Sequence, residues 1–326
     1  MTTAIDLRIF RNASALGLLN AMAGYFHVDP GVHYLVDQPW MGEFLRRQKI
    51  PDTQIVPVTG LRNLFALRRW TIILPLQRAR LDMVVLRLLG LITLKTFVHD
   101  FHFLSRRPLL AMEFSGRAAA VKRAIYLMVI RHADGILVDS RLVQRQVRRL
   151  FCRDSTLVGL KRIFARDDIA PAAGGQAPEV DYFIPLSGRR YKGSWALERL
   201  QFENPHSRVL VDSSHADEVR RLIGPRNPHV EVVHRDLRSE AALIDAFRDA
   251  RATLCLSRHE GFGFAPYEAA FFGSIPVVLN CTTYIEVPRT AFVKLPLAVL
   301  ITVPAADRLQ PGPAMQVLAN RHVVLA

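Results

Sequence analysis

The chain has 326 residues, half of them apolar, and a formal net charge of +14 at pH 7. This length and apolar content predict two folded domains and exclude a disordered, collagen-like or low-complexity protein. The charge favours partners that carry phosphate, whether nucleotide, nucleic acid or anionic membrane, without selecting among them. The three cysteines (Cys152, Cys255, Cys281) lack paired or metal-ligand spacing, so they are interpreted as reduced thiols of a cytosolic protein.

Strands and helices alternate along the first half of the chain, which predicts a parallel α/β sheet. The predicted strands are 5–10, 32–36, 55–58, 72–76, 92–98 and 135–138. The predicted helices are 15–26, 41–48 and 140–151, with Ser140 as a side-chain N-cap of the last.

A segment rich in alanine, proline and glycine, 167–179, is predicted to be a linker, and the alternation restarts after it. The predicted strands there are 182–186, 208–212, 230–234, 252–256 and 275–279, and the predicted helices are 195–203, 216–222, 240–250 and 265–272. The sequence therefore predicts two Rossmann-like domains, an N-terminal one over 1–172 and a C-terminal one over 173–326.

No targeting or membrane-spanning segment is recognisable. The first ten residues lack the charged-then-apolar pattern of a secretory signal. The apolar runs 81–98 and 292–305 contain charges or prolines, whereas a span needs about 20 mostly apolar residues. The predicted location is the cytoplasm, and peripheral attachment at the inner face of the cell membrane stays open.

The stretch 257–278 is the most informative part of the sequence. A predicted strand ends near its start, a glycine-containing turn follows at 261–264, and a helix opens with Pro266 in its first turn. Glycines let backbone amides approach a ligand, and a helix N-terminus favours phosphate. Glu260 and Glu268 are expected to converge at the carboxyl end of a strand, where open α/β sheets bind ligands. An ordinary strand–turn–helix joint with two solvated glutamates is the alternative.

This stretch resembles the signature of the family 4 retaining glycosyltransferases. Those enzymes have the GT-B architecture, in which two Rossmann-like doubly wound domains face each other across a cleft. The shared pattern is Glu-Gly-Phe-Gly, a second glutamate eight positions after the first, an alanine directly after it, and Pro-Val-Val further on. The resemblance implies that Glu268 binds the ribose hydroxyls of the nucleotide and that Glu260 faces the donor sugar. It also implies that the diphosphate is bound by backbone amides of Gly261, Phe262, Gly263 and Phe264.

A second segment, 186–193, follows the first strand of the predicted C-terminal domain. It is similar to the family's Gly-Arg, spacer and Lys-Gly, whose two cations clamp the diphosphate and stabilise it as the leaving group. Arg189 and Lys192 match that pattern, but the spacer is shorter than usual, so Arg190 is an alternative to Arg189. Arginine suits bidentate contact with phosphate. Taken alone, this segment would be a basic surface turn.

The first domain supplies weaker matches. The stretch 96–102 resembles the family's His-Asp after a core strand, whose histidine lies near the donor sugar hydroxyls. His99 is the better match, His102 is its competitor, and a purely structural histidine stays open. Gly17 stands where many family members carry a glycine pair that contacts the diphosphate and the acceptor. In the second domain, the family reads the nucleotide base by loop contacts that correspond to 236–240 here.

By this resemblance the chain transfers a sugar from a nucleotide diphosphate-sugar to an acceptor hydroxyl with retention of configuration, without a metal or another cofactor. No cluster of metal-ligating residues is evident in the sequence. The basic amphipathic segments 61–70 and 140–151, the second with Arg141, Arg145, Arg148 and Arg149, fit an anionic membrane surface. The acceptor would then be a glycan or a lipid-linked glycan of cell-envelope polysaccharide or lipopolysaccharide synthesis. A solvated basic face fits the same residues.

Three alternative functions stay open. One is a sugar-nucleotide epimerase of GT-B architecture, which the 260–268 motif disfavours. Another is a catalytically inactive GT-B-like binding partner of a functional transferase, because the segment 288–326 lacks the family's closing helices and the C-terminal domain looks shortened. The third is a nucleic-acid-binding protein, but no recognisable module supports it, so no nucleic-acid partner is predicted.

Overall fold

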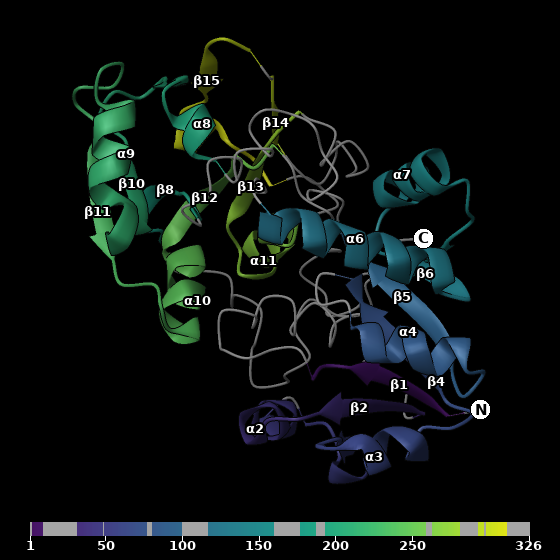
Figure 1. The fold of residues 1–326 in the computed structure, drawn as a ribbon. Coiled ribbons are helices and arrows are strands. Elements are labelled where there is room, and N and C mark those ends of the chain that lie inside the picture. Colours follow the sequence, from purple (N-terminus) through teal and green to yellow (C-terminus); the bar gives the residue numbers. More distant parts are fainter. Residues whose placement is uncertain are drawn as a thin grey trace. The chain divides into compact units, whose positions relative to one another are not determined.

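The computed structural model of the protein divides into two compact units, Met1–Ile169 with Val324–Ala326, and Ala170–Val323 (Figure 1). Each unit is built on a parallel sheet with helices packed against it. The residues that the structure describes are 2–8, 31–47, 49–76, 80–99, 117–159, 177–186, 193–258, 263–280, 293–296 and 298–311.

In the first unit the strand order is β3-β2-β1-β4-β5-β6-β7, and neighbouring strands are parallel. From β1 the chain adds β2 and β3 on one side of the sheet, and it then returns to add β4 to β7 on the other side, so the direction of winding reverses between β1 and β4. The segments after β1 and β4 therefore leave the carboxyl edge of the sheet where the winding reverses, the usual ligand position in open α/β sheets. The strands are β1 (Thr3–Asp6), β2 (Val32–Val36), β3 (Ile55–Pro57), β4 (Thr71–Pro75), β5 (Thr93–Val98), β6 (Gly135–Val138) and β7 (Thr156–Leu157).

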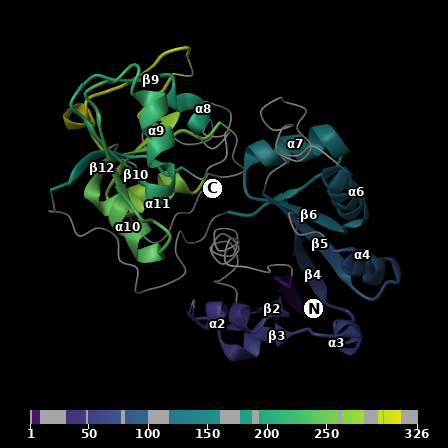
Figure 2. The same ribbon diagram turned by 60° about the vertical axis from the view of Figure 1, so that its left-hand side comes forward.

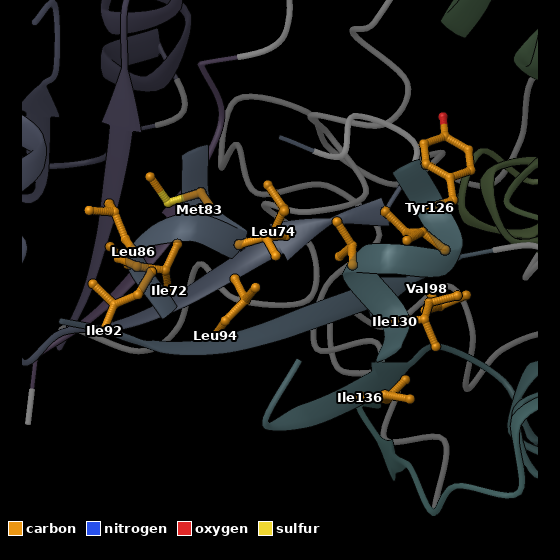
Figure 3. Packing of buried hydrophobic residues seen from close by; sticks show 14 of the residues in the cluster. Ile72, Leu74, Met83, Leu86, Ile92, Leu94, Val98, Tyr126, Ile130 and Ile136 are labelled. Carbon is orange, nitrogen blue, oxygen red and sulfur yellow. The ribbon is translucent and has the colours of Figure 1, made fainter. Parts of the chain in front are cut away.

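Two helices of this unit, α4 (Leu81–Leu88) and α6 (Arg117–His132), pack against each other and against β5. In Figure 3 Met83 and Leu86 from α4 lie near Ile72, and Ile130 from α6 lies beside Val98. Burying each large aliphatic side chain contributes about 1.5–3 kcal/mol, so this layer supplies much of the unit's stability. The other helices among the described residues of this unit are α2 (Pro39–Arg47), α3 (Leu61–Ala66), α7 (Arg141–Phe151) and the short 3-10 turn η2 (Asp52–Gln54).

In the second unit the main sheet has the order β11-β10-β8-β12-β13-β14, again with parallel neighbours. Its winding reverses between β8 and β12, so it has the same plan as the first sheet. Two short strands, β9 (Leu200–Phe202) and β15 (Ile301–Val303), pair in parallel as a separate small sheet. The main strands are β8 (Val180–Phe183), β10 (Arg208–Asp212), β11 (Glu231–Arg235), β12 (Ala250–Cys255), β13 (Ile275–Leu279) and β14 (Val293–Leu295).

The helices of the second unit cover its main sheet (Figure 2). Helix α9 (Ala216–Ile223) packs against β10 and β11, whereas α10 (Glu240–Asp249) and α11 (Ala265–Phe271) pack against β12. Phe247 of α10 joins the layers, since its ring meets Phe183 edge-on at 5.1 Å and stacks on Phe272 at 6.0 Å. The short elements are α8 (Ser194–Leu197), η6 (Ser213–His215) and η8 (Ala306–Arg308).

Most predicted elements are confirmed, and two need correction. The first strand was predicted over 5–10, but β1 ends at Asp6, because the Asp6 carboxylate accepts the backbone N–H of Arg8 and turns the chain there. The helix predicted over 195–203 is wrong in its second half, where Leu200–Phe202 form β9. The side chain of Asn227 holds that strand by accepting from the Phe202 N–H and donating to the Leu200 carbonyl, both at 2.9 Å. The predicted helix 15–26 lies outside the described residues.

Candidate functional site

The loops that carry the predicted donor-site residues leave from β8 and β12, the two strands between which the second sheet reverses its winding. These strands are parallel neighbours, with Tyr182 opposite Ala252 and Phe183 opposite Thr253. Because the carboxyl ends of parallel strands meet at one edge, the segments that follow β8 and β12 start side by side. This is the position at which open α/β sheets bind ligands.

Gly193 lies at the end of the segment that follows β8, and it contacts the start of that segment and the start of the one that follows β12. Its backbone has φ +140°, a conformation that side chains rarely adopt. A Cβ atom at this position would lie 3.0 Å from Leu186 Cδ2 and 3.3 Å from Leu256 Cβ. Leu186 precedes the 187–192 loop and Leu256 directly follows β12. Gly193 thus packs closely against Leu186 and Leu256 at the carboxyl edge, in a backbone conformation that favours glycine.

A second contact joins the same two segments. The Arg258 guanidinium, just after β12, lies 5.3 Å from the ring of Trp195 in α8, and Arg199 lies 5.2 Å from that ring. Trp195 is buried. A cation placed over an indole face contributes about 0.5–2 kcal/mol, so this stack helps to hold the β12 segment beside α8. The contact between Arg258 and Trp195 was not predicted, because these two residues lie far apart in the sequence.

Glu268 lies in the first turn of α11, which is built as the 257–278 motif predicted. Gly263, at φ +78°, turns the chain into the helix, and the Phe264 carbonyl accepts the backbone N–H groups of Tyr267 and Glu268 at 2.8 and 3.0 Å. Pro266, in the first turn, is buried together with most of the helix, whereas Glu268 is only partly buried. The helix core therefore fixes the backbone of Glu268, whose side chain is only partly buried.

A third loop is held at this edge by Asp212, the last residue of β10. Its carboxylate accepts the backbone N–H of Ser214 at 2.9 Å and that of Leu237 at 2.8 Å. Burial alone would raise the pKa of Asp212, but these hydrogen bonds outweigh it and keep the pKa below its usual value. The segment 236–240, expected from the resemblance to read the nucleotide base, is therefore held by Leu237 to β10, the strand beside β8.

In the first unit, His99 and Asp139 form a pair at the carboxyl edge of the sheet. His99 directly follows β5 and Asp139 directly follows β6, and the register places Val98 opposite Val138. His99 Nδ1 is in hydrogen-bond contact with Asp139 Oδ2. The Asp139 side chain is fully buried, and that of His99 is 17% exposed. Asp139 was missed as a candidate; its place directly after a buried strand next to β5 was the available signal.

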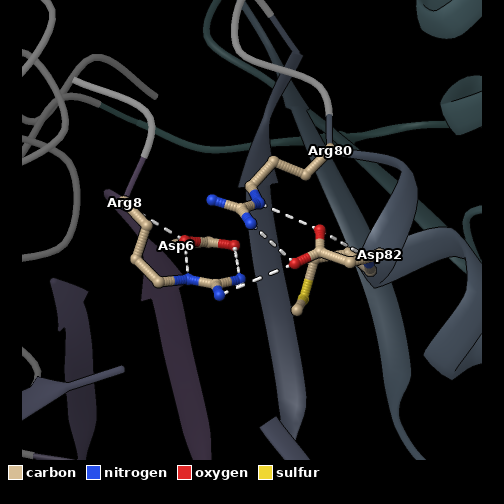
Figure 4. A network of polar contacts seen from close by, with 5 residues as sticks. Asp6, Arg8, Arg80 and Asp82 are labelled. Carbon is tan, nitrogen blue, oxygen red and sulfur yellow. Dashed lines mark hydrogen bonds and ion pairs between the residues drawn. The ribbon is translucent and has the colours of Figure 1, made fainter. Parts of the chain in front are cut away.

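Four charged side chains fill the edge where the first sheet reverses its winding (Figure 4). Arg8 forms a bidentate pair with Asp6 at 2.9 and 2.7 Å, and Arg80 forms another with Asp82 at 2.9 and 2.8 Å. Arg8 Nη1 lies 3.6 Å from Asp82 Oδ2, which links the two pairs. Burial raises the pKa of the neighbouring Asp37, although Arg80 and Arg8 oppose the rise. This Asp6–Arg8–Arg80–Asp82 cluster was not predicted.

Several predicted site residues lie outside the described part of the chain. They are Gly17, Arg189, Arg190, Lys192, Glu260, Gly261 and Phe262, together with the competitor His102. Among the residues that are described, no group of three or more His, Cys, Asp or Glu side chains is placed to hold a metal ion. Within the same ranges, each helix is too short or too polar to cross a bilayer.

No protein-family model and no curated protein matches the sequence. Solved structures do match. Anabaena HepE, in complex with UDP and glucose, has a TM-score of 0.59 at 12% identity, over 92% of this chain and 87% of its own. Sucrose-phosphate synthase from Thermosynechococcus elongatus has a TM-score of 0.57 at 12% identity, with the same two coverages. The chain has the GT-B fold.

A third match, starch synthase IV from Arabidopsis thaliana bound to ADP and acarbose, has a TM-score of 0.55 at 11% identity, over 94% of this chain and 89% of its own. At such identities the likeness concerns the fold. It confirms the predicted class, two Rossmann-like α/β domains of GT-B type.

Proposed function

We propose that this chain is a glycosyltransferase that moves a sugar from a nucleotide diphosphate-sugar to an acceptor hydroxyl. The observation that carries the proposal is that β8, β10 and β12 end at one carboxyl edge of the second sheet, where the winding reverses, and that α11 with the partly buried Glu268 follows β12. Two proteins of the same fold support a nucleotide ligand, since HepE was solved with UDP and glucose and starch synthase IV with ADP and acarbose.

In the proposed donor site, the Glu268 carboxylate accepts hydrogen bonds from the ribose hydroxyls. The amides of the 261–264 turn bind the diphosphate: Gly261, Phe262, Gly263 and Phe264. Arg189, with Arg190 as the alternative, and Lys192 clamp the same group. They neutralise the charge that grows on the leaving diphosphate as the sugar–phosphate bond breaks, so their effect is largest in the transition state. This cationic clamp performs the task that a metal ion performs in other transferases.

In the proposed chemistry the transferred sugar keeps its anomeric configuration. The bond to the diphosphate breaks first, leaving a sugar with oxocarbenium character. The acceptor hydroxyl then attacks from the face that the diphosphate leaves, and the leaving phosphate takes the hydroxyl proton. Glu260 is proposed to orient the sugar hydroxyls and to stabilise the positive charge, and His99 to contact a sugar hydroxyl. Gly17 is proposed to let the opening loop approach the substrates closely.

The direct test is a calorimetric and thermal-shift screen of the full chain against UDP, GDP, ADP and their glucose conjugates. One nucleotide is expected to bind, and at one hundred times its Kd it would stabilise the fold by about 2.7 kcal/mol. NMR of the anomeric proton of the product, formed with membrane extracts as acceptor, would report retention. A folded chain that binds no nucleotide contradicts the proposal. Binding without turnover favours the inactive binding partner.

We also propose a glycan or lipid-linked acceptor at an anionic membrane surface. The support comes from α7, in which Val143 and Val147 face the core and the arginines of the opposite side are exposed. Basic residues near an anionic bilayer contribute about 1 kcal/mol each. The exposed arginines are Arg141, Arg145, Arg148 and Arg149.

Sedimentation with vesicles tests this surface. Binding is expected to vesicles that contain anionic phospholipid and not to neutral ones. The double variant R141Q/R145Q should weaken it by about 2 kcal/mol, from roughly 1 kcal/mol per arginine. The matched control, R46Q/R47Q, removes the same charge from the exposed end of α2. Equal losses in both variants would show a net-charge effect only, and an absence of binding would leave α7 as a solvated face.

A further inference from the structure

The His99–Asp139 pair is built by the sheet itself. The two residues occupy equivalent positions after neighbouring parallel strands, so the register of Val98 with Val138 brings them together. The following residue, Ser140, caps α7 by accepting the Val143 N–H at 3.2 Å, which fixes the backbone on the other side of Asp139. The positions of both side chains are thus determined by regular structure.

Burial of Asp139 dictates how the pair shares its protons. A carboxylate taken out of water loses several kcal/mol of hydration free energy unless hydrogen-bond donors replace the water. The Asp139 carboxylate meets His99 Nδ1, so the stable arrangement places a proton on Nδ1. In a neutral imidazole one ring nitrogen donates a hydrogen bond and the other accepts one, and the tautomer of the ring decides which nitrogen does which. With Nδ1 protonated, Nε2 carries a lone pair.

We infer that Asp139 is a positioning residue, which holds His99 in the Nδ1–H tautomer so that Nε2 accepts a hydrogen bond from a hydroxyl of the donor sugar. The inference deepens the proposed function and rests on it. The two nitrogens lie on opposite sides of the ring, so contact of Nδ1 with the buried carboxylate directs Nε2 away from that carboxylate. The partial exposure of His99, beside a fully buried Asp139, agrees with this orientation.

The tautomer also selects the chemical group. An Nε2 atom without a proton cannot donate to a phosphate oxygen, whereas it accepts readily from an alcohol. The His99–Asp139 pair is therefore expected to bind a sugar hydroxyl and not a diphosphate oxygen. Its loss should weaken binding of a sugar nucleotide and leave binding of the bare nucleotide unchanged.

The tautomer can be measured without any ligand. Long-range proton–nitrogen NMR of the 15N-labelled full chain, at a pH where imidazoles are neutral, separates protonated from unprotonated ring nitrogens. The sequence has 11 histidines, so His99 is assigned by the signal that His99→Gln removes. A protonated Nδ1 and an unprotonated Nε2 are expected. A protonated Nε2, with or without a proton on Nδ1, overturns the inference.

Variants add a second measurement. Asp139→Asn keeps the shape but offers an amide, and it should move His99 toward the Nε2–H tautomer. The control is Asp134→Asn, at the other end of β6, where the carboxylate contacts Arg87 and the Leu94 N–H and not a histidine. The control should leave the His99 spectrum unchanged. If Asp139→Asn fails to fold, the wild-type spectrum still decides the tautomer.

Calorimetry with UDP, UDP-glucose, ADP and ADP-glucose then tests the function of the pair. In Asp139→Asn the sugar nucleotide is expected to bind about tenfold more weakly, the size of one lost hydrogen bond, with no change for the bare nucleotide. Equal weakening of both ligands, or of neither, overturns the sugar contact. If no probe binds the wild type, the proposed function fails and the sugar contact with it, whereas the tautomer stands or falls on NMR alone.

Discussion

Replacing Glu268 with alanine is expected to raise the Kd for the cognate nucleotide about a hundredfold, because each hydrogen bond to a charged group contributes about 1.5–3 kcal/mol. The change should leave the fold intact. The Glu268 side chain is only partly buried, and alanine is the best helix former for its position in α11. Isothermal calorimetry of the purified variant measures the loss directly.

A 2′-deoxynucleotide identifies the atoms involved. The wild type should bind it more weakly than the ribonucleotide, whereas Glu268→Ala should bind both alike, since the hydroxyl no longer has a partner. The control is Glu218→Ala, which removes a partly buried glutamate from the first turn of α9, a matched position in the same unit. Unchanged affinity in Glu268→Ala, or a deoxy effect that persists in it, would contradict the proposed ribose contact.

Asp6→Asn is expected to destabilise the first unit by about 3–5 kcal/mol, because removing one partner of a buried ion pair leaves the other charge uncompensated. The Asp6 side chain is 0% exposed and that of Arg8 is 3% exposed, so water cannot replace the lost carboxylate. Two units need not unfold together, so a single melting temperature would be hard to interpret. Hydrogen exchange of the β1 and β4 peptides, followed by mass spectrometry, measures the first unit alone.

The matched control breaks an exposed pair of similar geometry. Arg46 and Asp52 meet at 2.7 Å, but their side chains are 57% and 73% exposed. Arg46→Ala should therefore change stability by less than about 1 kcal/mol. The double variant Asp6→Leu/Arg8→Met should recover part of the loss of Asp6→Asn, since it removes both charges together. Slow exchange in β1 and β4 of Asp6→Asn would mean that the cluster contributes little to stability.

The sequence was informative where local chemistry decides the structure. Helices α7 and α10 were predicted within a residue, and each begins with a serine whose side chain accepts a backbone N–H, Ser140 from Val143 and Ser239 from Ala242. Such caps can be read from sequence because the interaction spans only three residues. The 257–278 motif likewise predicted the end of a strand and the start of α11 in their correct order.

Predictions from the sequence were wrong or missing where residues far apart in the chain decide the structure. Helix α4 was not predicted, because Arg80 precedes it without a side-chain cap and its apolar run resembles a buried strand. Strand β9 was mistaken for helix because its pairing depends on Asn227 and on β15. The pairing of His99 with Asp139 required the strand order, which no local pattern encodes. The Asp6–Arg8–Arg80–Asp82 cluster was missed for the same reason.

The reversed winding of the second sheet also has a consequence for folding. Strands β8 and β12 are neighbours in the sheet although β10 and β11 lie between them in the sequence, so the contact between Phe183 and Thr253 closes a long loop. Loop-closure entropy makes such non-local pairings slow to form. The proposed donor edge arises from this pairing and is absent from intermediates that contain β8, β10 and β11 alone. A bound nucleotide would therefore stabilise this non-local contact, and its binding would distinguish chains in which the edge is complete from chains in which it is not.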